Sequence, residues 1–153
     1  MTVLQILVAP AFGAALQPQA TAEVVAGQGL VGDRHFGLPP DEPGLQFTLV
    51  EAEAIERFNA AHGRQVVWAD ARRNVVTRGV DLRALIGRRF AIGTAEFVGI
   101  ERCEPCLKLG QRLAGDTLRP AQVVRWFLED GGLRADVRLS GRISVGDAVR
   151  VID

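Results

Sequence analysis

Cys103 and Cys106 are the only thiols in the chain, and two residues separate them. A thioredoxin-like redox pair would need this spacing at a helix start within a strand-helix-strand pattern, which the surrounding sequence does not supply. A zinc site needs four ligands, and only His35 and His62 remain as soft or imidazole candidates. Two interpretations stay open: a pair of buried small apolar residues, or one thiolate that binds a metal held mainly by its own organic cofactor.

Cationic side chains flank the cysteine pair. Arg102 and Lys108 would both favour the thiolate form of an exposed cysteine in this segment. Lys108 is also the only lysine among the 18 cationic residues, so any lysine chemistry has a single candidate.

A glycine-rich segment, residues 29–37, brings three polar side chains together in the sequence. Asp33 can orient the guanidinium of Arg34, which then offers a forked set of donors to an oxyanion such as a phosphate, and His35 follows directly. The alternative is a polar β-turn with a surface ion pair, which would contribute little.

A third segment, residues 72–82, carries Arg73, Asn74 and Thr77 along an expected strand and its end. These side chains are well suited to bind the phosphate and amide groups of a heterocyclic ligand. The alternative is a solvated strand edge, which arginine also suits.

Taken in order, these segments resemble the MOSC family, whose domain is related to the C-terminal part of molybdenum-cofactor sulfurase. The resemblance runs from about Gly27 to Val151. Its motifs are Gly32–His35, Arg73–Gly87, Gly93, Pro105–Leu109 and Gly141–Val149. Within Arg73–Gly87, the residues Arg78, Arg83 and Ala84 are not part of the motif. The combination is far more specific than any one segment.

The resemblance implies a molybdenum–pterin cofactor with Cys106 as metal ligand and catalytic residue. The side chains expected around that cofactor are Arg34, His35, Arg73, Asn74, Thr77 and Lys108. The mitochondrial amidoxime-reducing components and the bacterial hydroxylaminopurine-resistance proteins are relatives that reduce N-hydroxylated compounds, so the expected reaction is oxygen removal from an N–O bond. Pyridoxal phosphate, sometimes associated with the family, would have to bind at Lys108.

Two other functions stay open. Cys106 could carry a persulfide for metal–sulfur cofactor assembly, with Cys103 resolving it, or the chain could bind the cofactor without catalysis. The chain has neither the N-terminal barrel domain nor the C-terminal extension of the larger reductases, so whether it is an enzyme stays open as well. The expected partners are a small-molecule substrate or cofactor and a separate electron-donor protein or a cysteine desulfurase.

The elements that would position these residues are mainly β. Short segments rich in Val, Ile and Phe predict strands at residues 3–8, 21–25, 46–50, 73–77, 89–92, 95–100, 135–139 and 147–152. Helical spacing and end signals predict about three short helices, at residues 51–61, 81–86 and 120–129. Without regular strand-helix alternation, we expect a closed or nearly closed β-barrel, with irregular chain at residues 13–20 and 36–44.

Composition sets the remaining limits. The 153 residues are 48% hydrophobic and 24% charged with zero net charge, which predicts one globular domain spanning residues 1–153. The sequence has no basic stripe for a phosphate backbone, so nucleic acid is not an expected partner. The apolar start, residues 1–10, lacks the cationic region of a signal peptide and is far shorter than the roughly 20 residues of a membrane helix, so we expect a cytoplasmic protein.

Overall fold

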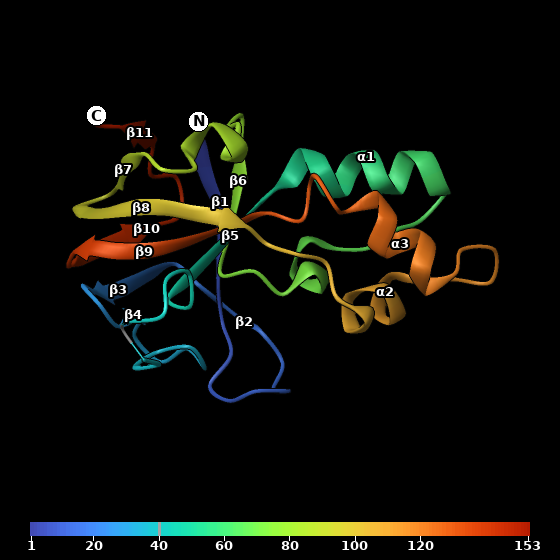
Figure 1. Cartoon of the computed structure of the whole chain (residues 1–153), viewed down its shortest axis with the longest axis horizontal. Helices are drawn as coiled ribbons and strands as arrows, with labels where there is room; N and C mark the ends of the chain where they lie inside the picture. Colours follow the sequence, from blue (N-terminus) through green and yellow to red (C-terminus); the bar gives the residue numbers. More distant parts are fainter. Residues whose placement is uncertain (40) are drawn as a thin grey trace.

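The computed structural model describes residues 1–39 and 41–153, and it is rich in strands (Figure 1). The strands are β1 (Thr2–Val8), β2 (Gln17–Gln19), β3 (Thr21–Val25), β4 (Gly29–Leu30), β5 (Phe47–Glu51), β6 (Val75–Arg78), β7 (Arg89–Ile92), β8 (Ala95–Arg102), β9 (Leu133–Leu139), β10 (Gly141–Ser144) and β11 (Val149–Val151). The helices are α1 (Ala52–His62), α2 (Leu107–Leu113) and α3 (Pro120–Trp126), with 3₁₀ turns η1 (Trp68–Ala71) and η2 (Leu82–Leu85). In Figure 1 the three α-helices lie together beyond one end of the strands.

The described strands form two sheets. The larger has eight strands in the order β11-β7-β8-β9-β5-β6-β1-β2, and the smaller has three in the order β10-β3-β4. Among these strands, β5 and β6 form a parallel pair, joined through α1, and the other pairs are antiparallel.

The mainly β prediction is confirmed, but the prediction of a barrel is not supported, because neither sheet closes on itself. The larger sheet keeps two edges, β11 and β2, each of three residues. The chain between β10 and β11 reaches β1 through an isolated bridge, Thr2–Ala148, and not through a ladder.

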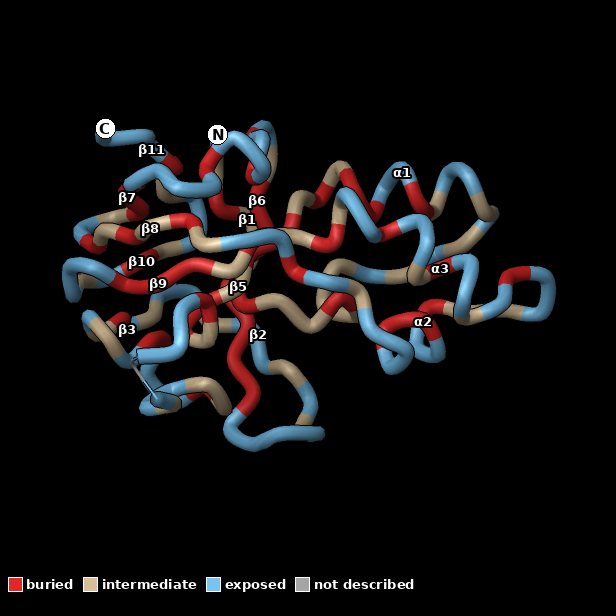
Figure 2. Tube along the Cα trace, viewed as in Figure 1, coloured by how far each residue is buried: buried red, intermediate tan, exposed pale blue. Residues whose placement is uncertain are grey.

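The core has two parts, one on each side of the central strands (Figure 2). Neighbouring residues of β6 belong to different parts of the core: Val75 packs in the part among the strands, whereas Val76 packs in the part toward the helices. Successive side chains of a strand point to opposite faces, so β5 and β6 are buried on both. Phe97 lies between Phe47 and Phe90 in the strand-side core, with ring centroids 4.7 and 5.4 Å away.

Each of the eight predicted strands is present, with shifted ends at several of them. β2, β4 and β10 were not predicted, because they have two to four residues and little hydrophobic pattern. β2 lies in residues 13–20, so the expectation of wholly irregular chain there is wrong. In residues 36–44 the described positions form no helix or strand, and Pro40 lies outside the described residues.

The described residues contain three α-helices, two of them at predicted places, and the third predicted place holds a 3₁₀ turn instead of an α-helix. α1 and α3 lie at two of the predicted places, and Gly63 ends α1 in a left-handed conformation (φ 59°). Residues 81–86 form the 3₁₀ turn η2, in which the Asp81 side chain accepts a hydrogen bond from the N–H of Arg83 (3.1 Å). The unpredicted α2 begins directly after Cys106.

None of the described helices is long and apolar enough to cross a membrane. The cytoplasmic location stays a prediction.

Candidate functional site

A cavity of about 150 Å³ lies where the sheet meets the helices, and Cys106 lines it. Its walls come from segments far apart in the sequence: the turn after β4, strands β5 and β9, the chain between η1 and β6, the end of β8, and α2. The lining residues are Arg34, His35, Thr48, Ala71, Arg72, Arg73, Cys103, Cys106, Leu109, Arg112 and Arg134.

Cys106 is the exposed thiol of this cavity. It precedes α2 in an extended conformation (φ −110°, ψ 170°), and its carbonyl accepts the first helical hydrogen bond, from Gly110 N–H (3.0 Å). A hydrogen bond from the backbone N–H of Leu109 lowers the pKa of Cys106, and the N–H of Lys108 and the charge of Arg73 act in the same direction. These groups favour the thiolate, which is the nucleophilic and metal-binding form.

Cys103 lines the same cavity but is buried, with 1% of its surface exposed. Its backbone N–H donates to Gly132 O (2.8 Å), which continues the pairing of β8 with β9. Burial raises the pKa of Cys103, against the charges of Arg73 and Arg134. Both cysteines are free thiols, and their surroundings favour opposite protonation states.

Five arginines make the cavity strongly cationic: Arg34, Arg72, Arg73, Arg112 and Arg134. The described lining contains no carboxylate. Within residues 1–39 and 41–153, Arg34 pairs with Asp33 and Arg134 with Glu101, whereas the other three make no ion pair. The cavity therefore carries positive charge that an anionic ligand would neutralise.

Backbone carbonyl groups hold these guanidinium groups in place. Arg72 donates to Ala14 O (2.7 Å), Arg73 to Gly131 O (3.0 Å) and Arg112 to Asp70 O (3.2 Å). Burial lowers the pKa of Arg112, and the charge of Arg72 lowers it further. Arg72 has φ 56°, the only positive φ outside glycine among the described residues. Such conformations cluster at functional sites, where the surrounding structure enforces them.

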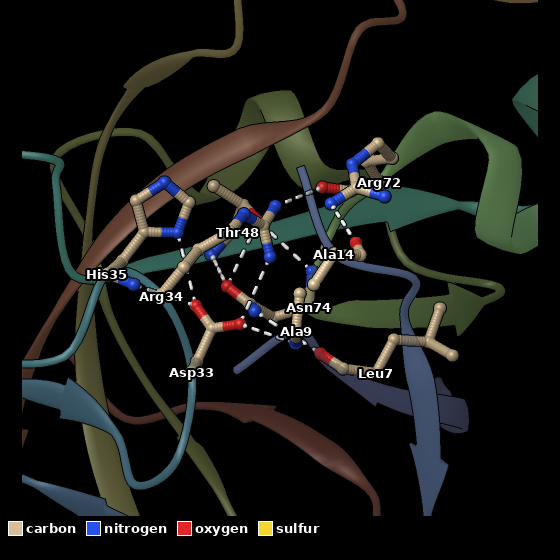
Figure 3. Close-up of polar contacts among 9 residues, drawn as sticks. All are labelled: Leu7, Ala9, Ala14, Asp33, Arg34, His35, Thr48, Arg72 and Asn74. Carbon is tan, nitrogen blue, oxygen red and sulfur yellow. Dashed lines mark hydrogen bonds and ion pairs between the residues drawn. The ribbon is translucent and has the colours of Figure 1, made fainter. Parts of the chain in front are cut away.

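Asp33 holds in place the part of the cavity wall that Arg34 and His35 form (Figure 3). One carboxylate oxygen accepts hydrogen bonds from Ala9 N–H (3.1 Å) and the Arg34 side chain (3.0 Å), and the second contacts the N–H (3.2 Å) and Nδ1 (3.1 Å) of His35. Burial opposes ionisation, but these hydrogen bonds and the charge of Arg34 lower the pKa of Asp33 to about 2. The expected Asp33–Arg34 pair is thus present, and it is a buried pair.

Residues 32–150 match the family model of the MOSC domain. The chain belongs to the MOSC domain family.

Solved structures share the fold of this MOSC domain. The YuaD protein of Bacillus subtilis is 21% identical with a TM-score of 0.84, over 99% of this chain and 96% of that one. YiiM of Geobacillus stearothermophilus is 14% identical with a TM-score of 0.74, over 99% and 75% of the two chains, and YiiM of Escherichia coli is 16% identical with a TM-score of 0.71, over 100% and 70%. At these identities the likeness shows the fold alone. No curated protein matches the sequence of this chain.

The MOSC domain does not bring all the expected cofactor-binding residues to the cavity. Arg34, His35, Arg73 and Cys106 line it, whereas Asn74, Thr77 and Lys108 are not among the lining residues. Lys108 is exposed on α2. Thr77 is fully buried and its hydroxyl donates to Val50 O (3.4 Å). The roles expected for these residues stay predictions.

Asn74 acts on the cavity through a neighbour (Figure 3). Its side-chain oxygen accepts hydrogen bonds from both the backbone N–H and the hydroxyl of Thr48 (each 3.1 Å), and its amide nitrogen donates to Leu7 O (3.3 Å). Thr48 lines the cavity, so Asn74 fixes the position of a lining residue.

Sequence reasoning missed Thr48, Arg72, Arg112 and Arg134. Arg72 directly precedes the predicted Arg73, and this adjacency could have indicated that it lies at the site. Arg112 lies on the unpredicted α2, and 27 residues of sequence separate Arg134 from Cys106, so neither could be placed without the fold.

Proposed function

We propose that this MOSC domain binds a molybdenum–pterin cofactor, with Cys106 as the metal ligand. The proposal rests on one observation: an exposed thiol, supported by backbone N–H donors, opens into a cavity that holds five arginines. A thiolate is a ligand for a soft metal, and arginines are the preferred partners of phosphate. The donor set of this cavity therefore fits the metal and the phosphate of such a cofactor.

The arginines would hold the phosphate. Arg72, Arg73 and Arg112 have guanidinium groups already anchored on carbonyl oxygens, so little side-chain freedom is lost on binding. A volume of about 150 Å³ is below the roughly 300 Å³ of pockets that enclose a whole ligand. We assign the charged end of the cofactor to the cavity and the remainder to the surface outside it.

The reaction that fits this site is reduction of an N–O bond in an N-hydroxylated compound. The bound cofactor would supply the redox chemistry, with electrons from a separate donor protein, and the chain would orient the substrate and move protons. The product oxygen must leave as water, which requires two protons. His35 is the candidate donor: its Nδ1 is fixed by Asp33 Oδ2 at 3.1 Å, which leaves Nε2 as the nitrogen for proton transfer.

Elemental analysis of molybdenum would test cofactor binding, on protein expressed in a host that makes the cofactor. We expect about one molybdenum per chain in the wild type, loss of the metal in Cys106→Ser, and its retention in Cys103→Ala, which removes the other thiol of the cavity. Metal that stays in Cys106→Ser contradicts the assignment of Cys106.

Arginine variants would test the phosphate assignment separately. Arg73→Gln and Arg112→Gln should each lower the molybdenum content or weaken retention of the cofactor on gel filtration. Arg125→Gln is the matched control, because Arg125 lies on α3 and is not among the lining residues. Equal retention in all three variants contradicts the assignment.

The exposure of Cys106 also supports a second candidate, sulfur transfer, in which this thiol carries a persulfide. Incubation with a cysteine desulfurase and mass spectrometry would test it, and added sulfur on Cys106 would support it. A chain that binds the cofactor but turns over no N-hydroxylated substrate with a competent reductant would instead be a binding module. The cavity gives no support to pyridoxal phosphate, since Lys108 is not among its lining residues.

A further inference from the structure

Two free thiols line one small cavity, and they differ in access. Cys106 is exposed, whereas Cys103 has 1% of its surface exposed. Two residues, Glu104 and Pro105, separate them, and residues 103–106 lie outside the helices and strands.

The two cysteines share surroundings as well as sequence. Both line a cavity of about 150 Å³, and the charge of Arg73 acts to lower the pKa of both thiols. A disulfide requires Cβ atoms about 4 Å apart, which a two-residue spacer permits in a non-helical segment. The backbone of Cys103 is anchored, because it bonds to Gly132 and its carbonyl oxygen lies where a Cβ on Gly131 would be. Closure would thus move the exposed Cys106 toward a fixed Cys103.

We propose that Cys103 is a resolving cysteine, which forms a reversible disulfide with Cys106 when Cys106 is oxidised by a peroxide. The exposed thiol meets the oxidant first, because burial shields Cys103. The bond itself does not depend on any cofactor. Its consequence rests on the proposed function: a Cys106 held in a disulfide cannot bind metal, so oxidation releases the cofactor and protects the ligand sulfur.

The chemistry balances with hydrogen peroxide as the oxidant. The Cys106 sulfur attacks one peroxide oxygen, the O–O bond breaks, and the departing hydroxide takes a proton to become water; sulfur is oxidised to a sulfenic acid and peroxide is reduced. The Cys103 sulfur then attacks the Cys106 sulfur. An S–S bond forms, the S–O bond breaks, and the leaving hydroxide takes the Cys103 proton as a second water.

The test treats the full-length chain with one equivalent of hydrogen peroxide, traps free thiols with N-ethylmaleimide in denaturant, so that the buried Cys103 is also accessible, and measures the intact mass. The wild type should lose the mass of two hydrogen atoms and take up no maleimide until a thiol reductant is added. Cys103→Ala should instead gain oxygen on Cys106, and with excess peroxide it should accumulate irreversible sulfinic acid about tenfold faster than the wild type. Cys106→Ser should keep a Cys103 that resists peroxide.

The wild type alone decides the outcome if a variant does not fold. Oxygen added to Cys106 without disulfide, or two thiols still trapped by maleimide, would overturn the proposal. Molybdenum measured before and after peroxide separates the two claims: a disulfide without any metal in the starting protein leaves the resolving role intact and counts against the proposed cofactor.

Discussion

The Asp33 carboxylate contacts His35 twice, through the backbone N–H at 3.2 Å and through Nδ1 of the imidazole at 3.1 Å (Figure 3). The same carboxylate bonds Arg34 and the backbone of Ala9 at the end of β1. One buried side chain thus ties two lining residues of the cavity to the end of strand β1 in the larger sheet. The hydrogen bonds of Asp33 that stabilise the fold therefore also fix the positions of Arg34 and His35 in the cavity.

Asp33→Asn should destabilise the fold, because Asn cannot supply the charge that pairs with Arg34. At pH 7 we expect the free energy of unfolding to fall by roughly 2 to 4 kcal/mol, as for one partner of a buried pair. The pKa of Asp33 is about 2 in the folded chain against an ordinary 3.8, so this stabilisation is present above about pH 4 and is lost as the pH falls toward 2. Urea unfolding from pH 7 to pH 3 would show the wild-type advantage shrinking below pH 4; a constant difference contradicts it.

His35→Gln should separate proton transfer from cofactor binding. Glutamine at this position keeps a hydrogen-bonding side chain but has no titratable nitrogen, so the rate of N–O reduction should fall about 100-fold or more while molybdenum content stays close to that of the wild type. Steady-state kinetics should place the loss in kcat more than in KM. Unchanged kcat would remove His35 from the proposed reaction.

Glu51, at the start of α1, should make stability fall as the pH rises. Burial raises the pKa of Glu51 to about 7, and the negative charge of Asp130 adds to the effect. A pKa raised on folding means that the stabilising protonated form is kept at low pH and lost between the ordinary value of 4.5 and about 7.

Glu51→Gln removes this titration and should raise the free energy of unfolding at pH 8 by about 1 to 2 kcal/mol, allowing for partial solvent screening. Denaturant unfolding at pH 4 is the control, where wild type and variant should agree. A variant that is no more stable at pH 8 would contradict the burial of a charged Glu51.

Gly132→Ala should destabilise the chain far more than Gly146→Ala. Both glycines have positive φ, 108° and 93°, so both substitutions strain the backbone by about 1 kcal/mol or more. Of the two, only Gly132 would bring the new Cβ against a neighbour, the carbonyl oxygen of Leu49. Thermal unfolding should show a loss of roughly 3 kcal/mol or more for Gly132→Ala. Similar losses in both variants would contradict the close approach of β9 to β5.

The strands of the core were the most predictable part of the fold. Segments such as 21–25 and 89–92 have the same bounds as the observed strands, because dense Val, Ile and Phe near glycine is a local signal. Helix α2 was not predicted, because Leu107–Leu113 has only seven residues and only two of its leucines are buried. Its partners, α3 and η1, are what make this short helix stable, since isolated helices of this length are not.

The family, the mainly β character, the pairing of Asp33 with Arg34 and the importance of the two thiols could all be predicted from the amino-acid sequence. Motif order and local hydrophobic pattern carry that information. Three features became visible in the folded chain alone: the larger sheet stays open, Cys103 is buried while Cys106 is exposed, and Arg112 and Arg134 join Arg73 around one cavity. The reason is that burial and charge proximity depend on contacts between segments distant in sequence, and composition and spacing do not encode which of those contacts form.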